Sequence, residues 1–201
     1  GHTMSPVLHK RLFEIAGVPL SYQLFEVSPQ ELKEKMPELL SLDGFNITMA
    51  HKQAVIPFLD QLSEGAALYE SVNTVVCRDE KGRSVGYNTD VIGFTRCVEM
   101  LGASFQGKEV CILGAGGAGR MMAIESAKQG ARLTIAVRTL QKGEQLGQEV
   151  RAKVPKADVR VVLLDELCER YDLIANATSV GMYPHVENTL VSDAVLRKAG
   201  A

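Results

Sequence analysis

An apolar run followed at once by a glycine cluster constrains the fold of this chain more than any other feature. Residues 110–113 (VCIL) have the composition of a buried strand, and the sequence GAGGAG occupies positions 114–119 directly after it. A helix over 121–129 and a second strand over 132–137 are expected next. Glycines at this spacing, between a strand and a helix, are the fingerprint of a dinucleotide-binding βαβ unit.

Each glycine of the cluster has its own physical role. Gly114 permits a sharp turn, Gly116 lets the backbone approach a pyrophosphate, and Gly119 lets the helix pack closely on the sheet. The first turn of the helix then offers free N–H groups and a positive dipole end to the phosphates. The alternative is a tight turn without a ligand, which the flanking strand and helix disfavour. The cofactor contacts expected in this cluster are Gly114, Ala115, Gly116, Gly117 and Ala118.

The end of the second strand distinguishes NADP from NAD. An NAD site places a carboxylate there to bind the ribose hydroxyls. In this chain Val137 is followed by Arg138 and Thr139, with Lys142 close behind, and no carboxylate occupies the strand end. Arg138 can form a fork around a 2′-phosphate and stack on adenine, and the other two residues add donors. We therefore expect NADP, although a solvated arginine on a loop is the alternative.

The rest of the chain also alternates strands and helices. In the second half, strands over 159–163 and 173–177 continue the series and give the βαβαβαβ order of a Rossmann-like sheet. In the first half, helices are expected over 5–17, 28–39 and 51–59, and strands over 22–27, 44–48, 72–78 and 84–87. Ser5 is the expected N-cap of the first helix, with Pro6 at its first position. This order predicts a mostly parallel sheet with covered faces in the first half as well.

The pattern as a whole predicts two α/β domains. Residues 1–97 would form a substrate-binding catalytic domain and residues 98–201 a Rossmann-like NADP-binding domain, linked by a helix over 90–101. A last helix is expected over 192–198. Both ends look cut, so that a strand before residue 1 and further elements after residue 201 are expected.

Composition argues against several other functions. The chain has 22 Lys and Arg against 24 Asp and Glu, for a net charge of -2, which favours neither a nucleic-acid nor a membrane partner. No apolar run approaches the roughly 20 residues needed to span a bilayer, and no signal pattern opens the chain. Four cysteines form no CxxC pair and three lie in apolar or periodic segments, which favours buried free thiols and a reducing cytoplasm. The four histidines form no cluster with cysteines, so no metal is expected.

Several polar residues in the first half lie where ligands usually bind. Thr3 and Ser5 bracket a helix start, where hydroxyls and free N–H groups suit a carboxylate, although Ser5 could be only an N-cap. Lys52 follows a strand end, and Asp90 begins the linking helix at the mouth between the halves. On their own, a lysine and an aspartate at such positions are more often surface charges.

Six segments resemble, in order, the successive signatures of the shikimate dehydrogenase family. They are residues 2–9 (HTMSPVLH), 44–52 (GFNITMAHK), 71–75 (SVNTV), 86–94 (GYNTDVIGF), 114–120 (GAGGAGR) and 176–182 (NATSVGM). Together they span nearly the whole chain, and six ordered motifs are far more specific than one. The resemblance implies a cytoplasmic enzyme of aromatic amino-acid (chorismate) biosynthesis that reversibly reduces 3-dehydroshikimate to shikimate with NADPH.

The resemblance also implies roles for individual residues. Lys52 and Asp90 would be the catalytic pair and would contact substrate. Thr3 and Ser5 would hold the substrate carboxylate, while Thr48 and Asn73, with Asp90, would bind ring hydroxyls. The nicotinamide side of the cleft would be lined by Asn176, Ala177, Thr178, Ser179 and Met182.

The chain departs from the family pattern at four positions. Ala50 replaces a proline, Thr3 a serine, Val137 an asparagine and Gly119 an alanine, the last expected to be a mild change. Two alternative functions stay open: a quinate/shikimate dehydrogenase of broader specificity, and a truncated, non-catalytic NADP-binding module. The expected partner is a small-molecule substrate, with no nucleic acid and no membrane, and the protein would be a monomer or homodimer.

Overall fold

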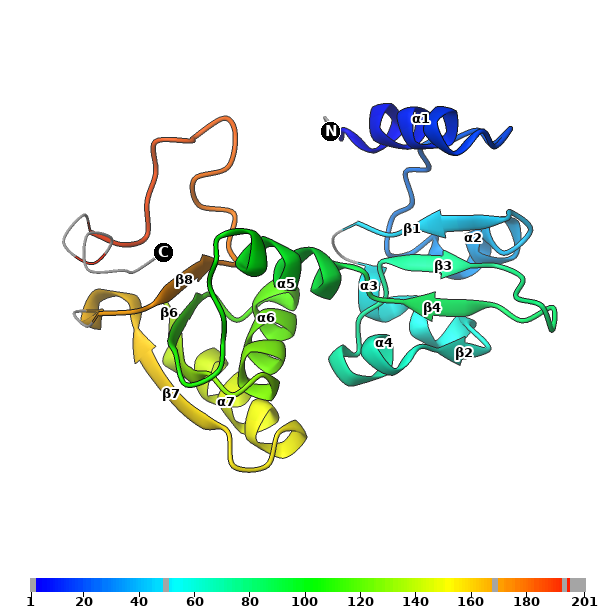
Figure 1. Ribbon diagram of the computed structural model, residues 1–201. Helices are drawn as coiled ribbons and strands as arrows, with labels where there is room; N and C mark the ends of the chain where they lie inside the picture. The colour runs from blue at the N-terminus through cyan, green and yellow to red at the C-terminus, as the bar shows by residue number, and fades with distance from the viewer. Residues whose placement is uncertain (1–2, 49–50, 168–169, 193–194, 196–201) are drawn as a thin grey trace.

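Two β-sheets, one in each half of the chain, form the framework of the protein (Figure 1). The computed structural model describes residues 3–48, 51–167, 170–192 and 195. The first sheet has the strand order β1-β3-β4-β2, and the second has the order β7-β6-β5-β8. Helix α5 (Asp90–Met100) joins the two halves and packs against α6 (Gly117–Lys128) of the second.

The remaining elements of the first half are α1 (Ser5–Ala16), α2 (Leu32–Leu39), β1 (Gly44–Asn46), α3 (His51–Ala54), the 3-10 turn η1 (Ile56–Phe58), β2 (Gln61–Leu62), α4 (Glu64–Tyr69), β3 (Thr74–Val76) and β4 (Val85–Tyr87). Those of the second half are β5 (Glu109–Leu113), β6 (Arg132–Val137), α7 (Leu140–Lys153), β7 (Asp158–Leu163), the 3-10 turn η2 (Leu164–Glu166) and β8 (Leu173–Asn176).

The second sheet confirms the predicted Rossmann-like order. All of its strand pairs are parallel, and β5 lies between β6 and β8. Side chains along β5 alternate between two cores: Val110 and Ile112 pack with α6, whereas Cys111 and Leu113 pack with Tyr171. A strand buried on both faces needs this continuous apolar run, which is why the sequence revealed it. Chain order reverses beside β5, the point where ligands of such sheets bind.

The first sheet is mostly antiparallel, so the prediction of a mostly parallel sheet there was wrong. β3 pairs antiparallel with both β1 and β4, and only β2 pairs parallel with β4. The connection between β3 and β4 is too short for a crossover, which needs a dozen or more residues. It turns at Gly82, whose φ is 75°, and the Asp79 carboxylate accepts N–H groups from Lys81 and Arg83.

Three other predictions for the first half were wrong. Residues 22–27 form no strand, because among the described residues no other segment pairs with them. α2 begins at Leu32, since the N–H and hydroxyl of Ser28 bond the Glu31 carboxylate and close a turn first. The helix expected over 51–59 divides into α3 and η1, with Pro57 inside the second piece.

Two elements were not predicted. These are β2 and α4, which occupy the stretch between Leu59 and Ser71. α4 has an ordinary N-cap signal, because the Ser63 hydroxyl accepts the N–H of Ala66 at 3.2 Å. The apolar run Ala66–Tyr69 is too short to show a helical period, so this signal stood alone.

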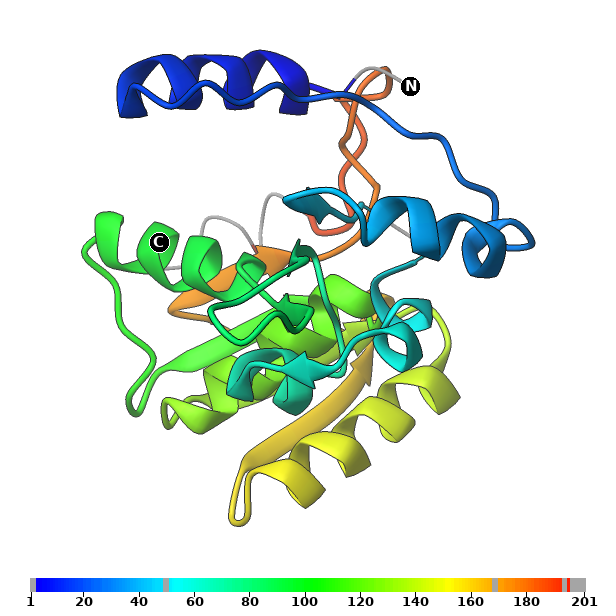
Figure 2. The same cartoon turned by 90° about the vertical axis from the view of Figure 1, so that its right-hand side faces the viewer.

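Helix α1 lies apart from both sheets (Figures 1 and 2). It buries no side chain, and Leu8, Leu12 and Ile15 are exposed. It ends at Gly17 with φ 65°, as predicted, but its N-cap is Met4 and not Ser5, which is the first helical residue. Most of the last predicted helix (192–198) lies outside the described residues, as do Ala50 and Cys168.

The expectation of buried free thiols is confirmed at two positions. Cys77 and Cys111 are buried and free, whereas Cys97, on the solvent side of α5, is exposed. In the described part of the chain no helix is long and apolar enough to cross a membrane. Nor do the described histidine, cysteine and acidic side chains gather into a possible metal site.

The thiols should differ sharply in reactivity. Burial raises the pKa of the Cys111 thiol to about 12, so at pH 8 it is protonated as well as inaccessible. Peptide mapping after brief alkylation of the native protein should find label at Cys97 and almost none at Cys77 or Cys111. Equal labelling of Cys111 and Cys97 in folded protein would contradict the placement of β5 in the core.

Candidate active site

The ammonium of Lys52 and the carboxylate of Asp90 form an ion pair at the junction of the two halves. Lys52 lies on the short helix α3, and Asp90 is the first residue of α5. Their Nζ and Oδ2 atoms are 2.6 Å apart. The side chains are 29% and 41% exposed, so both are held by protein on one side and open to a ligand on the other.

Asn73 fixes the orientation of this carboxylate. Its Nδ2 donates to Oδ1 of Asp90 at 2.8 Å, and its own Oδ1 accepts the backbone N–H of Thr89 at 2.8 Å. Asn88 adds a buried support, because its Oδ1 accepts the N–H of Asp90 and its Nδ2 donates to the carbonyl of Ser71. Each oxygen of Asp90 therefore has a separate partner, Lys52 on one and Asn73 on the other. The structure brings together the three predicted residues Lys52, Asn73 and Asp90.

Three neighbouring polar residues were missed by the sequence reasoning. The Thr74 hydroxyl donates to Oδ1 of Asn73 at 3.1 Å and accepts Nδ2 of Asn46 at 3.1 Å. The Thr89 hydroxyl bonds the Asn73 amide as well. Asn46 and Thr74 are opposite each other in the β1–β3 register. The antiparallel register brings these two side chains together, and the expected parallel sheet did not predict that pairing.

The remaining predicted substrate contacts form a separate group. The Thr3 hydroxyl donates to the Ser5 hydroxyl at 3.0 Å and accepts its N–H, at the start of α1. Thr48 is exposed just after β1. Among the described contacts, none links these three residues to Lys52 or Asp90, so their roles stay predictions.

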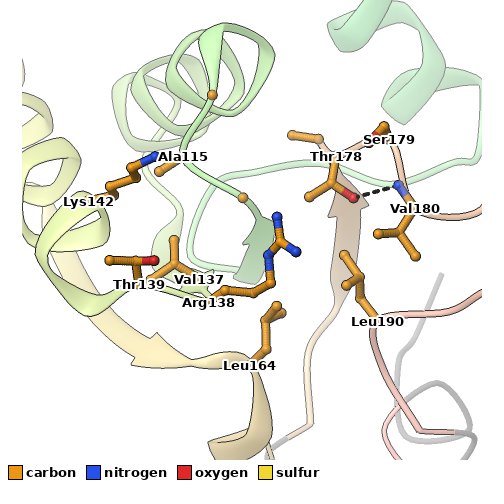
Figure 3. A pocket seen from close by; sticks show the side chains of 13 residues that line it. Ala115, Val137, Arg138, Thr139, Lys142, Leu164, Thr178, Ser179, Val180 and Leu190 are labelled. Carbon is orange, nitrogen blue, oxygen red and sulfur yellow. Dashed lines mark hydrogen bonds between the residues drawn. The ribbon is translucent and has the colours of Figure 1, made fainter.

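A cavity of about 320 Å³ lies at the carboxyl ends of the second sheet's strands (Figure 3). It is lined by Gly114, Ala115, Gly116, Val137, Arg138, Thr139, Lys142, Leu164, Ala177, Thr178, Ser179, Val180 and Leu190. Nine of the predicted cofactor residues are in this lining. Gly117, Ala118, Asn176 and Met182 are not, and Val137, Leu164, Val180 and Leu190 were not predicted. Leu164 directly follows β7, so the strand-end rule could have found it.

Two glycines of the cluster are required by the fold itself. Gly114 has φ 103°, and a Cβ there would lie 2.7 Å from the Thr178 methyl. A Cβ on Gly119 would collide with the carbonyl oxygen of Gly114, which confirms the predicted close packing of α6. The expectation that alanine at position 119 is a mild change was therefore wrong for this chain. Gly116 instead faces open space within the cavity lining, as a backbone that receives a ligand should.

The basic residues at the end of β6 have no acidic partner among the described residues. The side chains of Arg138 and Lys142 are exposed, and both line the same cavity as Ala115 of the glycine cluster (Figure 3). β6 ends at Val137, and no carboxylate follows it directly. A phosphate dianion beside the cluster would therefore meet uncompensated positive charge.

Asn176 shapes the loop after β8. Its Nδ2 donates to the Val180 carbonyl at 2.9 Å, and its Oδ1 accepts the N–H and hydroxyl of Thr178. The Thr178 hydroxyl in turn accepts the N–H of Val180 at 3.1 Å (Figure 3). Asn176 thus holds the cavity wall from behind, and Met182 is exposed further along the loop.

The fold, the cavity and the Lys52–Asp90 pair together define a class of protein. A parallel sheet with a glycine turn, a cavity at its switch point and two cations that no described carboxylate neutralises suits a phosphorylated dinucleotide. An ammonium held by a carboxylate lies beside the other sheet. Such a two-domain α/β protein is a nucleotide-dependent oxidoreductase.

Known proteins narrow this class to one family. Residues 1–75 match the shikimate dehydrogenase substrate binding domain, and residues 96–199 match the shikimate / quinate 5-dehydrogenase family. A shikimate dehydrogenase (NADP(+)) of Alkaliphilus metalliredigens is 37% identical over 199 residues, which cover 95% of this chain and 69% of the relative. The chain belongs to the shikimate dehydrogenase family.

Solved structures agree in three dimensions. A crystal structure of a shikimate dehydrogenase in complex with NADP+ matches with a TM-score of 0.87 and 36% identity, over 95% of this chain and 68% of that one. A shikimate 5-dehydrogenase from Listeria monocytogenes, in complex with shikimate and NAD, matches with a TM-score of 0.82 and 30% identity. The match covers 96% of this chain and 70% of that one.

The glycine geometry predicts two different defects. Gly119→Ala should destabilise the protein by about 1–3 kcal/mol, as overpacking does, because the new methyl meets the Gly114 carbonyl. Gly116→Ala, the matched control, should cost under about 1 kcal/mol, since its methyl enters open space. Urea unfolding measures both. NADP+ titration should show weaker binding for Gly116→Ala, and a Gly119→Ala variant as stable as the wild type would contradict the packing.

Proposed function

We propose that this chain catalyses the reversible, NADPH-dependent reduction of 3-dehydroshikimate to shikimate in the cytoplasm. The observation that carries the proposal is the Lys52–Asp90 pair with Asn73 on its far side. A non-catalytic NADP-binding module has no need of a held ammonium at the junction of two domains. Residues 1–97 would form the catalytic domain and residues 98–201 the NADP-binding domain.

Lys52 would act on the oxygen of the substrate's ring carbonyl. Reduction of a ketone places negative charge on that oxygen, and an ammonium beside it both stabilises the charge and delivers a proton. Asp90 keeps the ammonium in one place, because its carboxylate is fixed in turn by Asn73 and by the Asn88 side chain. Proton transfer depends on this orientation, since the donor must face the reacting atom.

Other polar residues would select the substrate. Asn73, Asp90 and Thr48 would bind ring hydroxyls, and the paired hydroxyls of Thr3 and Ser5 would bind the carboxylate at the start of α1. Quinate, which carries one more ring hydroxyl than shikimate and has a saturated ring, is the alternative substrate, and the matched family includes quinate dehydrogenases by its description. Rates on the two acids compared side by side distinguish these functions. Whether the protein acts as a monomer or homodimer is a separate question that its mass in solution answers.

The cavity residues would hold the cofactor. Gly114 to Ala118 would receive the pyrophosphate, and Arg138, Thr139 and Lys142 would bind the 2′-phosphate of the adenosine ribose. The loop residues Asn176, Ala177, Thr178, Ser179 and Met182 would border the nicotinamide. When bound, NADPH supplies the hydride for the reduction.

Removal of the ammonium tests the catalytic role. Lys52→Ala should lower kcat for the NADPH-dependent reduction of 3-dehydroshikimate by at least ~10²-fold, the low end of general-acid effects, with NADPH binding unchanged. The absorbance of reduced nicotinamide reports the rate. Lys33→Ala, an exposed lysine on α2, is the control and should keep the normal rate. A near-normal kcat for Lys52→Ala would remove this residue from the mechanism.

Removal of the guanidinium tests the cofactor preference. Arg138→Gln should raise the KM for NADP+ by about 10–100-fold, the value of a charged hydrogen-bond pair, and change the KM for NAD+ much less. Arg78→Gln, an exposed arginine of the other half, should change neither. The assignment of NADP would be wrong if wild-type kcat/KM were higher with NAD+ than with NADP+.

A further inference from the structure

A second charged cluster joins the two halves of the protein, away from the cofactor cavity. It combines the end of α4 in the first half with α6 and α7 of the second, and we call it the α4 clamp. Its members are Tyr69, Glu70, Arg120, Glu125, Glu149 and Lys153. Arg120 ends the segment 114–120, but the sequence assigns no role to it or to the other five, and none has a part in the chemistry above.

Arg120 is the centre of the α4 clamp. Its guanidinium is only 12% exposed and donates from Nη1 to the Tyr69 carbonyl at 2.6 Å. Nη2 lies 2.8 Å from the Glu70 carboxylate, and Nε donates to Glu149 at 2.7 Å. The planar fork of arginine, which lysine lacks, thus joins a backbone carbonyl of one half to carboxylates of both.

The end of α4 depends on these contacts. Glu70 follows the helix with φ 46°, a left-handed conformation that glycine usually adopts at this position. Its carboxylate is held by Arg120 and by Lys153 at 2.9 Å, and these hydrogen bonds lower the pKa of Glu70, with the larger effect from Lys153. The positive charges also lie at the negative end of the helix dipole. The second half therefore caps a helix of the first.

Tyr69 adds a buried contact between α4 and α6. Its side chain is 2% exposed, and its hydroxyl donates to Oε2 of Glu125 on α6 at 2.5 Å. Burial, together with the hydrogen bond to Glu125, raises the pKa of the Tyr69 phenol well above its ordinary value. The phenol stays a donor across the working pH range, so the contact persists.

The segment that leaves the α4 clamp leads directly to the catalytic pair. Two residues after Glu70, the N–H of Val72 donates to the Lys52 carbonyl at 2.8 Å. The next residue is Asn73, which holds Asp90. At the other side of the clamp, the N–H of Arg120 donates to the Gly116 carbonyl in the glycine cluster. Arg120 therefore contacts the phosphate-binding turn through its backbone N–H, and the end of the segment that positions the proton donor through its guanidinium.

We propose that Arg120 is a positioning residue that sets the placement of the Lys52–Asp90 pair relative to the bound cofactor. The inference rests on the proposed function for its kinetic consequence. Loosening the clamp should impair the chemical step more than the binding of NADP+, because small misplacements of a catalytic group are costly while the cavity lining is unchanged. If the clamp only stabilised the fold, its removal would lower stability without lowering kcat more than NADP+ affinity.

The test compares two arginines that each donate to a backbone carbonyl. Arg120→Met removes the clamp, and Arg151→Met, the control, removes a bond to the Val159 carbonyl inside the second half. We expect Arg120→Met to lower kcat by about 10-fold or more, with the Kd for NADP+ within about 3-fold of wild type. Arg151→Met should keep kcat. Arg120→Lys, which keeps the charge without the fork, should recover part of the loss.

Hydrogen exchange gives a readout that needs no catalysis. In Arg120→Met, peptides over 66–75 should exchange faster, because the Val72 bond to Lys52 loosens, while Arg151→Met should affect only peptides around β7. If the variants showed this exchange pattern but the wild-type protein did not oxidise shikimate, the proposed function would fail and the coupling would stand. Unchanged kcat in Arg120→Met, or an equal loss in Arg151→Met, would overturn the proposal. If Arg120→Met does not fold, Glu70→Gln should show a smaller loss of kcat with the Kd for NADP+ again little changed. An unchanged kcat in Glu70→Gln would then overturn the proposal.

Discussion

The Lys52 ammonium and the Asp90 carboxylate face each other at the start of α5, where the chain passes from one half to the other. A partly exposed ion pair adds little to stability, so its value lies in orientation. Asn73 and Asn88 fix the carboxylate, and the carboxylate fixes the ammonium. The segment from Ser71 to Asn73 supports the pair from behind, because the Ser71 carbonyl accepts from Asn88 and the Val72 N–H donates to the Lys52 carbonyl.

The second half could be predicted almost completely, for a physical reason. Strands of a parallel sheet are covered on both faces and carry long apolar runs, and the turn after β5 admits only glycine at Gly114. The positions of Arg138 and Lys142 followed from the same rule about strand ends. Gly119 shows where the rule stopped: only the coordinates reveal that the Gly114 carbonyl leaves no room for a methyl.

The first half was harder because its elements are short and its contacts non-local. Strands of two or three residues show no period, so the sequence does not predict β2. The alternation over 22–27 predicts a strand, but no other described segment pairs with it. Asn46 and Thr74 meet only through antiparallel register, and Arg120 meets Glu70 across two domains. Strand and helix ends point to Lys52 and Asp90 as candidates, but only the family resemblance predicts that they act together with Asn73, since nothing in the spacing of three isolated polar residues predicts that they converge.

The most direct measurement of the central claim is a crystal structure of the protein with NADP+ and shikimate bound. The account predicts that Nζ of Lys52 lies within hydrogen-bond reach, about 2.6–3.2 Å, of the ring oxygen on the carbon that faces the nicotinamide. Asp90 should still contact Lys52 in that complex. A shikimate ring bound with its reacting oxygen directed away from Lys52, or a Lys52 side chain turned out of the junction, would contradict the account.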